Sequence, residues 1–191
     1  MKFPHRMSTF AVLFLLALVG APERALALSS TNPQVSGGYS ASCAVKTDGT
    51  LVCWGIDYWG QTEVPIGLGA VSQGSVAIYY ETRAVQADGT VACWGYNPFG
   101  AATVPVGLGS VSQVSTAEKY NCALKTDGTV ICWGDLQDSG SVVPAGLNSV
   151  TQISALYQHT CAVKTDGTVV CWGNDQLGQS TVPVGLTAVS Q

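Results

Sequence analysis

Seven cysteines are the residues of this chain best suited to chemistry, and six of them fall into pairs. In each pair nine residues separate the two cysteines. Zinc sites usually have two to four residues between paired cysteines, and redox motifs have two, so this spacing favours neither use. The spacing instead predicts three disulfide bonds, with buried free thiols as the alternative. The predicted pairs are Cys43–Cys53, Cys122–Cys132 and Cys161–Cys171.

A β-hairpin around an Asp-Gly-Thr sequence accounts for the spacing of each pair. Asp-Gly between two runs of β-forming residues is a strong hairpin signal. If residues 47–49 form a three-residue turn with Gly49 in the left-handed region, Cys43 lies directly opposite Cys53. A two-residue turn would offset the two cysteines, so the pairing depends on an odd loop length.

One cysteine has no partner in this scheme. Arg83 stands where the first cysteine of the second hairpin would be, so we predict that Cys93 is a free thiol. Burial beside Trp94 as a small apolar residue and use in an intermolecular bond are both open.

The sequence contains no set of residues that predicts catalysis. His159 lies in a repeated motif, and a lone histidine there favours a structural hydrogen bond over a general base. The aspartates of the Asp-Gly-Thr sequences are typical turn residues. Neither a phosphate loop nor a Ser-His-Asp set is present in the sequence. We therefore predict a protein that is not an enzyme and that uses no cofactor or metal.

The N-terminal residues resemble a secretory signal peptide. Lys2 and Arg6 give a basic start, residues 10–20 are apolar, and residues 25–27 supply small residues before a cut. The apolar run is shorter than the roughly 20 residues of a membrane helix. We predict a signal peptide over 1–27, a linker over 28–33 and no membrane span after cleavage. The mature protein is then secreted, to an extracellular, periplasmic or cell-surface location.

Four repeats fill the rest of the chain. The Asp-Gly-Thr triplet recurs at spacings of 40, 39 and 39 residues, at Asp48, Asp88, Asp127 and Asp166. Each unit contains three to four short strands, the fourth being an outer edge strand such as 180–183, where proline is tolerated. Units of about 40 residues with this content are typical of propeller blades. The sequence predicts an all-β, propeller-type repeat array with four blades at 34–72, 73–112, 113–151 and 152–190.

Composition limits the kinds of partner. Of the 191 residues 47% are hydrophobic and 10% are charged, which is too apolar for a disordered chain. The net charge of −4 argues against nucleic acid as a partner, because phosphate binding needs clustered Lys and Arg.

The repeated motifs resemble a known family. Residues 172–179 (WGNDQLGQ), preceded by residues 159–163 (HTCAV), are similar to the regulator of chromosome condensation repeat. The repeat length and the Thr-Val-Pro ending most resemble its bacterial secreted branch, which includes a Streptomyces β-lactamase inhibitor protein. The resemblance implies a β-propeller, normally with seven blades. With four blades we expect an open arc or partial propeller that can self-associate through its exposed blade ends.

Variation between the repeats predicts the binding residues. Four tryptophans are invariant and are expected to pack between blades: Trp54, Trp94, Trp133 and Trp172. The segment after each Trp-Gly and the segment before each hairpin vary and are rich in Tyr, Trp and Asp, a composition typical of protein recognition. Loop variation without function is the alternative, and some of these tyrosines could fill gaps between blades. The predicted protein-binding residues are Tyr58, Trp59, Tyr79, Tyr80, Tyr96, Phe99, Tyr120, Asp138 and Asp175.

These observations favour a secreted, non-enzymatic module that binds a protein through variable aromatic loops on a propeller face. Enzyme inhibition is one specific version of this function. The family resemblance also implies, as an alternative, guanine-nucleotide exchange on a small GTPase. A third alternative is a cell-surface protein that binds carbohydrate or has a structural role.

Overall fold

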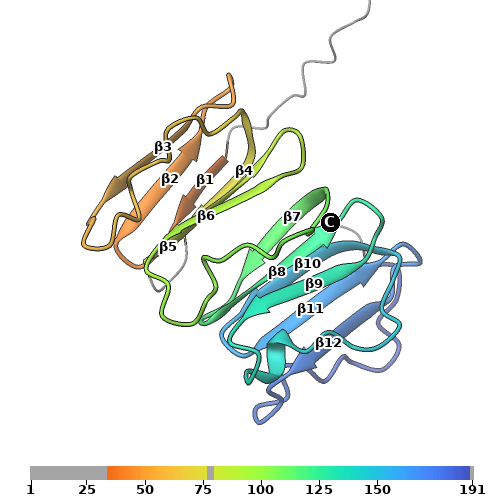
Figure 1. The fold of residues 1–191 in the computed structure, drawn as a ribbon. Helices are drawn as coiled ribbons and strands as arrows, with labels where there is room; N and C mark the ends of the chain where they lie inside the picture. The colour runs from red at the N-terminus through yellow and green to blue at the C-terminus, as the bar shows by residue number, and fades with distance from the viewer. Residues whose placement is uncertain (1–33, 77–79, 190–191) are drawn as a thin grey trace, which may run out of the picture.

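A computed structural model describes residues 34–76 and 80–189, and these residues form four antiparallel three-stranded sheets (Figure 1). The predicted signal peptide and linker lie outside the described residues. Each sheet is one blade. Blade 1 has β1 (Gln34–Gly37), β2 (Ala41–Val45) and β3 (Leu51–Gly55), and blade 2 has β4 (Val71–Val76), β5 (Glu81–Gln86) and β6 (Val91–Gly95). Blade 3 has β7 (Val111–Thr116), β8 (Tyr120–Lys125) and β9 (Val130–Gly134), and blade 4 has β10 (Val150–Leu156), β11 (His159–Lys164) and β12 (Val169–Gly173).

The described residues contain one short 3-10 helix, η1 (Ser139–Ser141), and no α-helix. In that part of the chain, accordingly, nothing forms a helix long and apolar enough to cross a membrane. The predicted all-β, propeller-type architecture is confirmed.

The hairpin turns have the predicted form. The Lys46 amide donates to the Thr50 carbonyl over 2.8 Å, and the Gly49 amide donates to the Lys46 carbonyl over 2.9 Å. Gly49 has a φ of +82°, which is the left-handed conformation that this turn requires. The Asp48 carboxylate accepts the Thr50 amide over 2.9 Å and closes the turn.

This turn sets the register of β2 and β3, and the equivalent turns set it in the other blades. Each cysteine of a pair lies directly opposite its partner across the hairpin. The three predicted disulfides are confirmed, with Cα–Cα distances of 4.1, 4.0 and 4.0 Å for Cys43–Cys53, Cys122–Cys132 and Cys161–Cys171. Cys93 is a free cysteine, as predicted.

Of the three to four strands predicted for each blade, three are present, and the predicted outer edge strand is wrong. Residues 180–183 form no strand, and each blade has three. The Pro183 carbonyl accepts the Leu186 amide over 3.2 Å, so the chain turns immediately after the proline. Gly185 adopts a φ of +82° in that turn. Residues 183–186 thus form a β-turn in which the glycine takes the position that needs a positive φ. An extended edge strand is incompatible with this turn.

Consecutive blades are joined by a repeated contact that we call the blade clamp. One backbone carbonyl in the loop after the third strand of a blade accepts two hydrogen bonds from the next blade. The donors are an indole Nε1 and a polar side chain of the middle strand. Trp94 and Thr82 donate to Gln61 (3.1 and 2.6 Å), Trp133 and Asn121 donate to Ala101 (2.7 and 2.9 Å), and Trp172 and Thr160 donate to Gly140 (2.8 and 3.0 Å).

The clamp explains why three of the invariant tryptophans pack between blades. Trp133 and Trp172 are buried, with 5% and 7% of their surface exposed. Trp54 departs from the expectation, because no blade precedes it in the described chain and it is 50% exposed.

The innermost strands are joined by glutamine side chains. The Gln113 amide donates to the Ile153 carbonyl and accepts the Ile153 amide, both over 2.9 Å. Gln73 makes the same pair of bonds with Val114, at 3.1 and 2.9 Å. These bonds place β4, β7 and β10 side by side along the inside of the array. The first and fourth sheets lie at opposite ends of the array, which is open (Figure 1).

Candidate protein-binding face

The two variable segments of every blade meet at one edge of the sheet. A backbone amide just after each third strand donates to a carbonyl in the loop between the first two strands. These bonds run from Ile56 to Ser40 (2.9 Å), from Tyr96 to Tyr80 (3.0 Å), from Asp135 to Lys119 (3.0 Å) and from Asn174 to Gln158 (2.8 Å). The segments chosen from the sequence for their variation therefore form a single face.

Aromatic rings on this face contact each other across the gap between blades 1 and 2. The rings of Trp59 and Tyr96 lie with centroids 4.5 Å apart, and those of Tyr39 and Tyr80 lie edge to face at 6.3 Å. Both distances are in the range where aromatic pairs attract beyond simple burial. Trp59, Tyr39 and the neighbouring Tyr58 remain exposed. The rings are thus held in place and still present their surfaces to solvent.

The face continues to blade 3 through a cation–π contact. The Lys119 ammonium lies 5.3 Å from the centroid of the Phe99 ring. Phe99 is exposed. We call the set Tyr39, Tyr58, Trp59, Tyr80, Tyr96, Phe99 and Lys119 the aromatic face.

Two tyrosines in these loops have unusual backbone conformations. Tyr80 and Tyr157 have φ values of +59° and +51°, in the left-handed region that bulky side chains rarely occupy. Strain of this kind persists only where the surroundings enforce it and is concentrated at functional sites. In blade 2 the residue with this backbone conformation is Tyr80, whose ring contacts that of Tyr39.

Asp175 is exposed and shapes its own loop. Its carboxylate accepts the Ser180 amide over 2.8 Å and the Thr181 hydroxyl over 2.6 Å. The hydrogen bond from the Thr181 hydroxyl, supported by backbone amides, lowers the pKa of Asp175. Asp57 in blade 1 accepts the Thr62 amide over 2.7 Å in the same way. These acidic residues position the loop that carries the exposed side chains.

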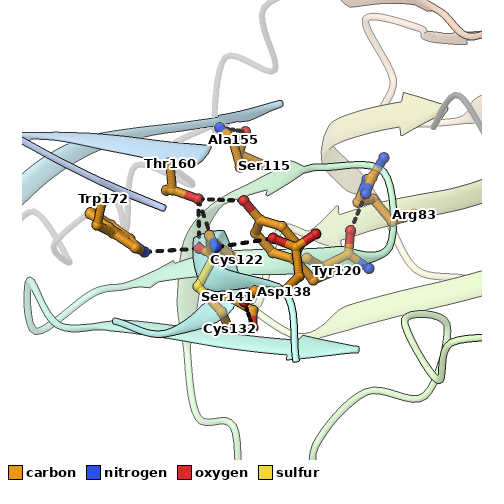
Figure 2. The surroundings of a disulfide bond; sticks show 12 residues. Arg83, Ser115, Tyr120, Cys122, Cys132, Asp138, Ser141, Ala155, Thr160 and Trp172 are labelled. Carbon is orange, nitrogen blue, oxygen red and sulfur yellow. Dashed lines mark hydrogen bonds between the residues drawn. A yellow bond between two sulfur atoms is a disulfide. The ribbon is translucent and has the colours of Figure 1, made fainter. Parts of the chain in front are cut away.

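Two predicted binding residues, Tyr120 and Asp138, are buried, and Figure 2 shows them near Thr160, Trp172 and the Cys122–Cys132 disulfide. Tyr120 is fully buried between blades 3 and 4, where its hydroxyl lies 2.9 Å from the Thr160 hydroxyl. Burial raises the pKa of Tyr120 to about 12. Asp138 is buried as the N-cap of η1, where it accepts the Gly140 amide over 3.0 Å. Both are structural residues of the interface between blades 3 and 4, so their prediction as surface binding residues was wrong.

Of the other predicted binding residues, Tyr79 lies outside the described residues. Tyr58, Trp59, Tyr80, Tyr96 and Phe99 lie on the aromatic face, and Asp175 is exposed in blade 4, outside that face. Their role in binding stays a prediction.

A buried polar cluster between blades 2 and 3 was not foreseen. The Arg83 guanidinium donates to the Asn121 amide oxygen, and Asn121 donates to the Glu81 carboxylate over 2.6 Å. All three side chains are buried. Burial raises the pKa of Glu81, although the charge of Arg83 opposes the shift. The sequence signal was Arg83 in place of a cysteine, which indicated only a missing disulfide.

The free thiol lies in the same cluster, because Cys93 is directly opposite Arg83. Burial raises the pKa of Cys93 to about 12, which disfavours the reactive thiolate at neutral pH. His159 lies half-buried in β11. Within residues 34–76 and 80–189, no three His, Cys, Asp or Glu side chains are grouped so that they could hold a metal ion.

Comparison with known families gives a match to the Regulator of chromosome condensation (RCC1) repeat over residues 34–61 and 150–179. These two segments are similar to RCC1 repeats. They lie in blades 1 and 4 and include the cysteine pairs and Trp-Gly motifs of those blades. No curated protein matches the chain in sequence.

Several solved structures are similar to this chain in fold. The entire ectodomain of the Physcomitrella patens receptor kinase CR4 has a TM-score of 0.68 and 27% identity, covering 82% of this chain and 44% of that one. The ectodomain of the Arabidopsis thaliana receptor kinase ACR4 has a TM-score of 0.60 and 27% identity, covering 73% and 55%. Yeast RCC1 (Prp20), solved bound to Kap60, has a TM-score of 0.66 and 17% identity, covering 81% and 47%, and this likeness shows the fold alone. The chain therefore spans about half the length of these proteins.

Proposed function

We propose that this chain is a secreted, non-enzymatic module that binds a protein partner through the aromatic face. The observation that carries the proposal is the pair of ring contacts between blades 1 and 2, extended by the contact of Lys119 with Phe99. These contacts gather aromatic side chains from blades 1 and 2, together with Lys119 of blade 3, on a rigid frame. Aromatic residues dominate the binding energy of protein interfaces because they bury much area at low entropic cost.

The frame under this face supports the proposal. Two blade clamps and the buried cluster of Arg83, Glu81 and Asn121 hold blades 1 to 3 together. A rigid frame lowers the conformational entropy that binding would otherwise cost. Variable side chains on a fixed scaffold are the arrangement by which repeat proteins recognise different partners.

The disulfides support secretion. Disulfides persist in oxidising compartments and are rare in the cytosol, and this chain has three. The receptor kinase relatives are similar to this chain through their ectodomains. Inhibition of an enzyme is the specific version of protein binding that the resemblance to the bacterial secreted branch suggests.

The experiment compares the proteins captured from secreted and cell-surface extract by the oxidised chain and by three variants. Trp59→Ala and Phe99→Ala remove rings from the aromatic face, and Val106→Ala removes a fully exposed side chain elsewhere. A partner on this face binds the wild type and Val106→Ala equally. Each ring variant weakens its binding by about 2 kcal/mol or more, roughly 30-fold.

The melting temperature of each variant separates recognition from folding. Because both rings are exposed, Trp59→Ala and Phe99→Ala keep the wild-type melting temperature within a few degrees. A partner that binds all variants equally would contradict the proposal, as would large destabilisation with binding retained. Accelerated nucleotide release from a small GTPase would favour exchange activity instead, and a positive glycan array would favour carbohydrate binding.

A further inference from the structure

The two ends of the array expose the two halves of the interface that joins consecutive blades. At the blade 1 end, Trp54 has the place in its repeat that Trp133 and Trp172 have in theirs, yet half of its surface is exposed. Val35 corresponds to Val114 and Ile153, which are 3% and 2% exposed, whereas Val35 is 77% exposed. The first blade thus presents the donor half of a blade clamp together with the apolar positions around it.

The blade 4 end presents the other half. In blade 1, three apolar residues are buried because blade 2 packs against them: Cys43, Val45 and Leu51. Their counterparts in blade 4 are only half-buried: Cys161, Val163 and Val169. Leu186, the counterpart of the partly buried Leu68, is exposed as well. This face carries the residue types that every internal interface covers.

The polar groups of the two ends also match. The Gln179 carbonyl has the position in blade 4 of the clamp carbonyls of Gln61, Ala101 and Gly140, which accept an indole and a polar side chain of the following blade. Trp54 and Ser42 have the positions of those donors in blade 1. Gln152 has the position of Gln113, whose side chain bonds the backbone of Ile153. Val35 is the residue of blade 1 that corresponds to Ile153.

We propose that blade 1 of one copy of this chain docks on blade 4 of a second copy, head to tail. The contact continues the three interfaces within the chain. Trp54 and Ser42 of one copy donate to the Gln179 carbonyl of the other, and the Gln152 side chain bonds the backbone of Val35. Such an interface is heterologous, and two copies close it into a ring of eight blades. Eight blades is within the range of about four to eight seen in propellers.

The test measures the mass of the oxidised full chain by sedimentation velocity across the micromolar range. Trp54→Glu changes the blade 1 end, Val169→Glu changes the blade 4 end, and Val106→Glu is the control at a fully exposed position inside the array. The wild type and the control have twice the mass of one chain. Each of the two interfaces in the ring joins the blade 1 end of one copy to the blade 4 end of the other. A substitution at either end therefore disrupts both interfaces, so Trp54→Glu and Val169→Glu are each monomeric.

Mixing the two end variants distinguishes head-to-tail docking from other arrangements. The mixture retains one intact interface, between Trp54 of one variant and Val169 of the other, so the mass doubles again. Gln152→Glu, which keeps the size of the side chain and removes one donor, weakens the association of otherwise wild-type chains about tenfold. Circular dichroism checks that each variant is folded.

Several results would overturn the proposal. A wild type that stays monomeric across the micromolar concentration range would overturn it. A dimer that persists in either end variant would show that the copies associate through a different interface. A mixture of the end variants that stays monomeric would exclude the head-to-tail contact. An end face covered by a different protein while the chain itself stays monomeric would also refute it.

Discussion

Arg83→Cys should create a fourth disulfide with Cys93. The register of β5 and β6 places residue 83 directly opposite Cys93, as in the three hairpins that carry disulfides. Closing a loop of this length stabilises the folded chain by about 3 kcal/mol in the chain-entropy description. For a chain of this size, that corresponds to a rise in melting temperature of roughly 6–12 °C.

Because Arg83→Cys removes a buried cation as well as adding a cysteine, the matched control is Arg83→Ser, which removes the same cation without adding a thiol. Both variants lose the hydrogen bond from Arg83 to Asn121 and the charge beside Glu81. Both also remove the Arg83 Nε and Nη2 groups, which are buried without a hydrogen-bond partner. The difference in unfolding free energy between the two variants therefore isolates the disulfide.

Two measurements decide the result. Thiol titration of the unfolded, unreduced protein should find one free thiol in the wild type and none in Arg83→Cys. Chemical denaturation should find Arg83→Cys more stable than Arg83→Ser by about 3 kcal/mol. Two free thiols in the variant, or equal stability of both variants, would refute the argument that hairpin register alone sets disulfide formation in this chain.

Three further predictions concern buried groups. Because burial raises the pKa of Cys93 to about 12, iodoacetamide should label the folded wild type far more slowly than the unfolded chain, and equal rates would contradict this. Burial also raises the pKa of Glu81 above its ordinary value of 4.5, so the folded chain binds more protons than the unfolded chain above that pH. Stability then falls as the pH rises through the raised pKa, and Glu81→Gln should flatten that slope in denaturation curves measured at several pH values. A Cβ at Gly140 would lie 2.7 Å from the Gln158 carbonyl carbon and against the Tyr120 hydroxyl, so Gly140→Ala should cost about 1–3 kcal/mol. Tyr120→Phe should recover part of that loss in a double-mutant cycle.

The hairpins could be predicted from the sequence because their cause is local. An odd loop with Gly49 in the left-handed conformation places Cys43 opposite Cys53, and all of these residues lie within eleven positions. The fourth strand could not be predicted in this way. Proline is compatible with an edge strand and with a turn, and the hydrogen bond from Leu186 to Pro183 decides for the turn.

The binding face was predictable in part, for a different physical reason. Variation between repeats located the loops, but it could not separate exposed tyrosines from tyrosines that fill the space between blades. Tyr120 is buried because residue 140 of the same blade is a glycine and Thr160 of the next blade offers a partner. The cluster of Arg83 and Asn121 likewise depends on a contact between residues 38 positions apart. Such contacts are set by the stacking of blades, which a single repeat does not encode.

The blade clamp also imposes an order on folding during synthesis. The carbonyl of Gln61 receives Thr82 from 21 residues downstream and Trp94 from 33 residues downstream. The clamps at Ala101 and Gly140 have separations of 20 and 32 residues. Each newly made blade therefore waits for most of the next repeat to emerge from the ribosome before its own outer loop is fixed. The outer loop of each blade can therefore be fixed only about 30 residues behind the point at which the chain emerges from the ribosome.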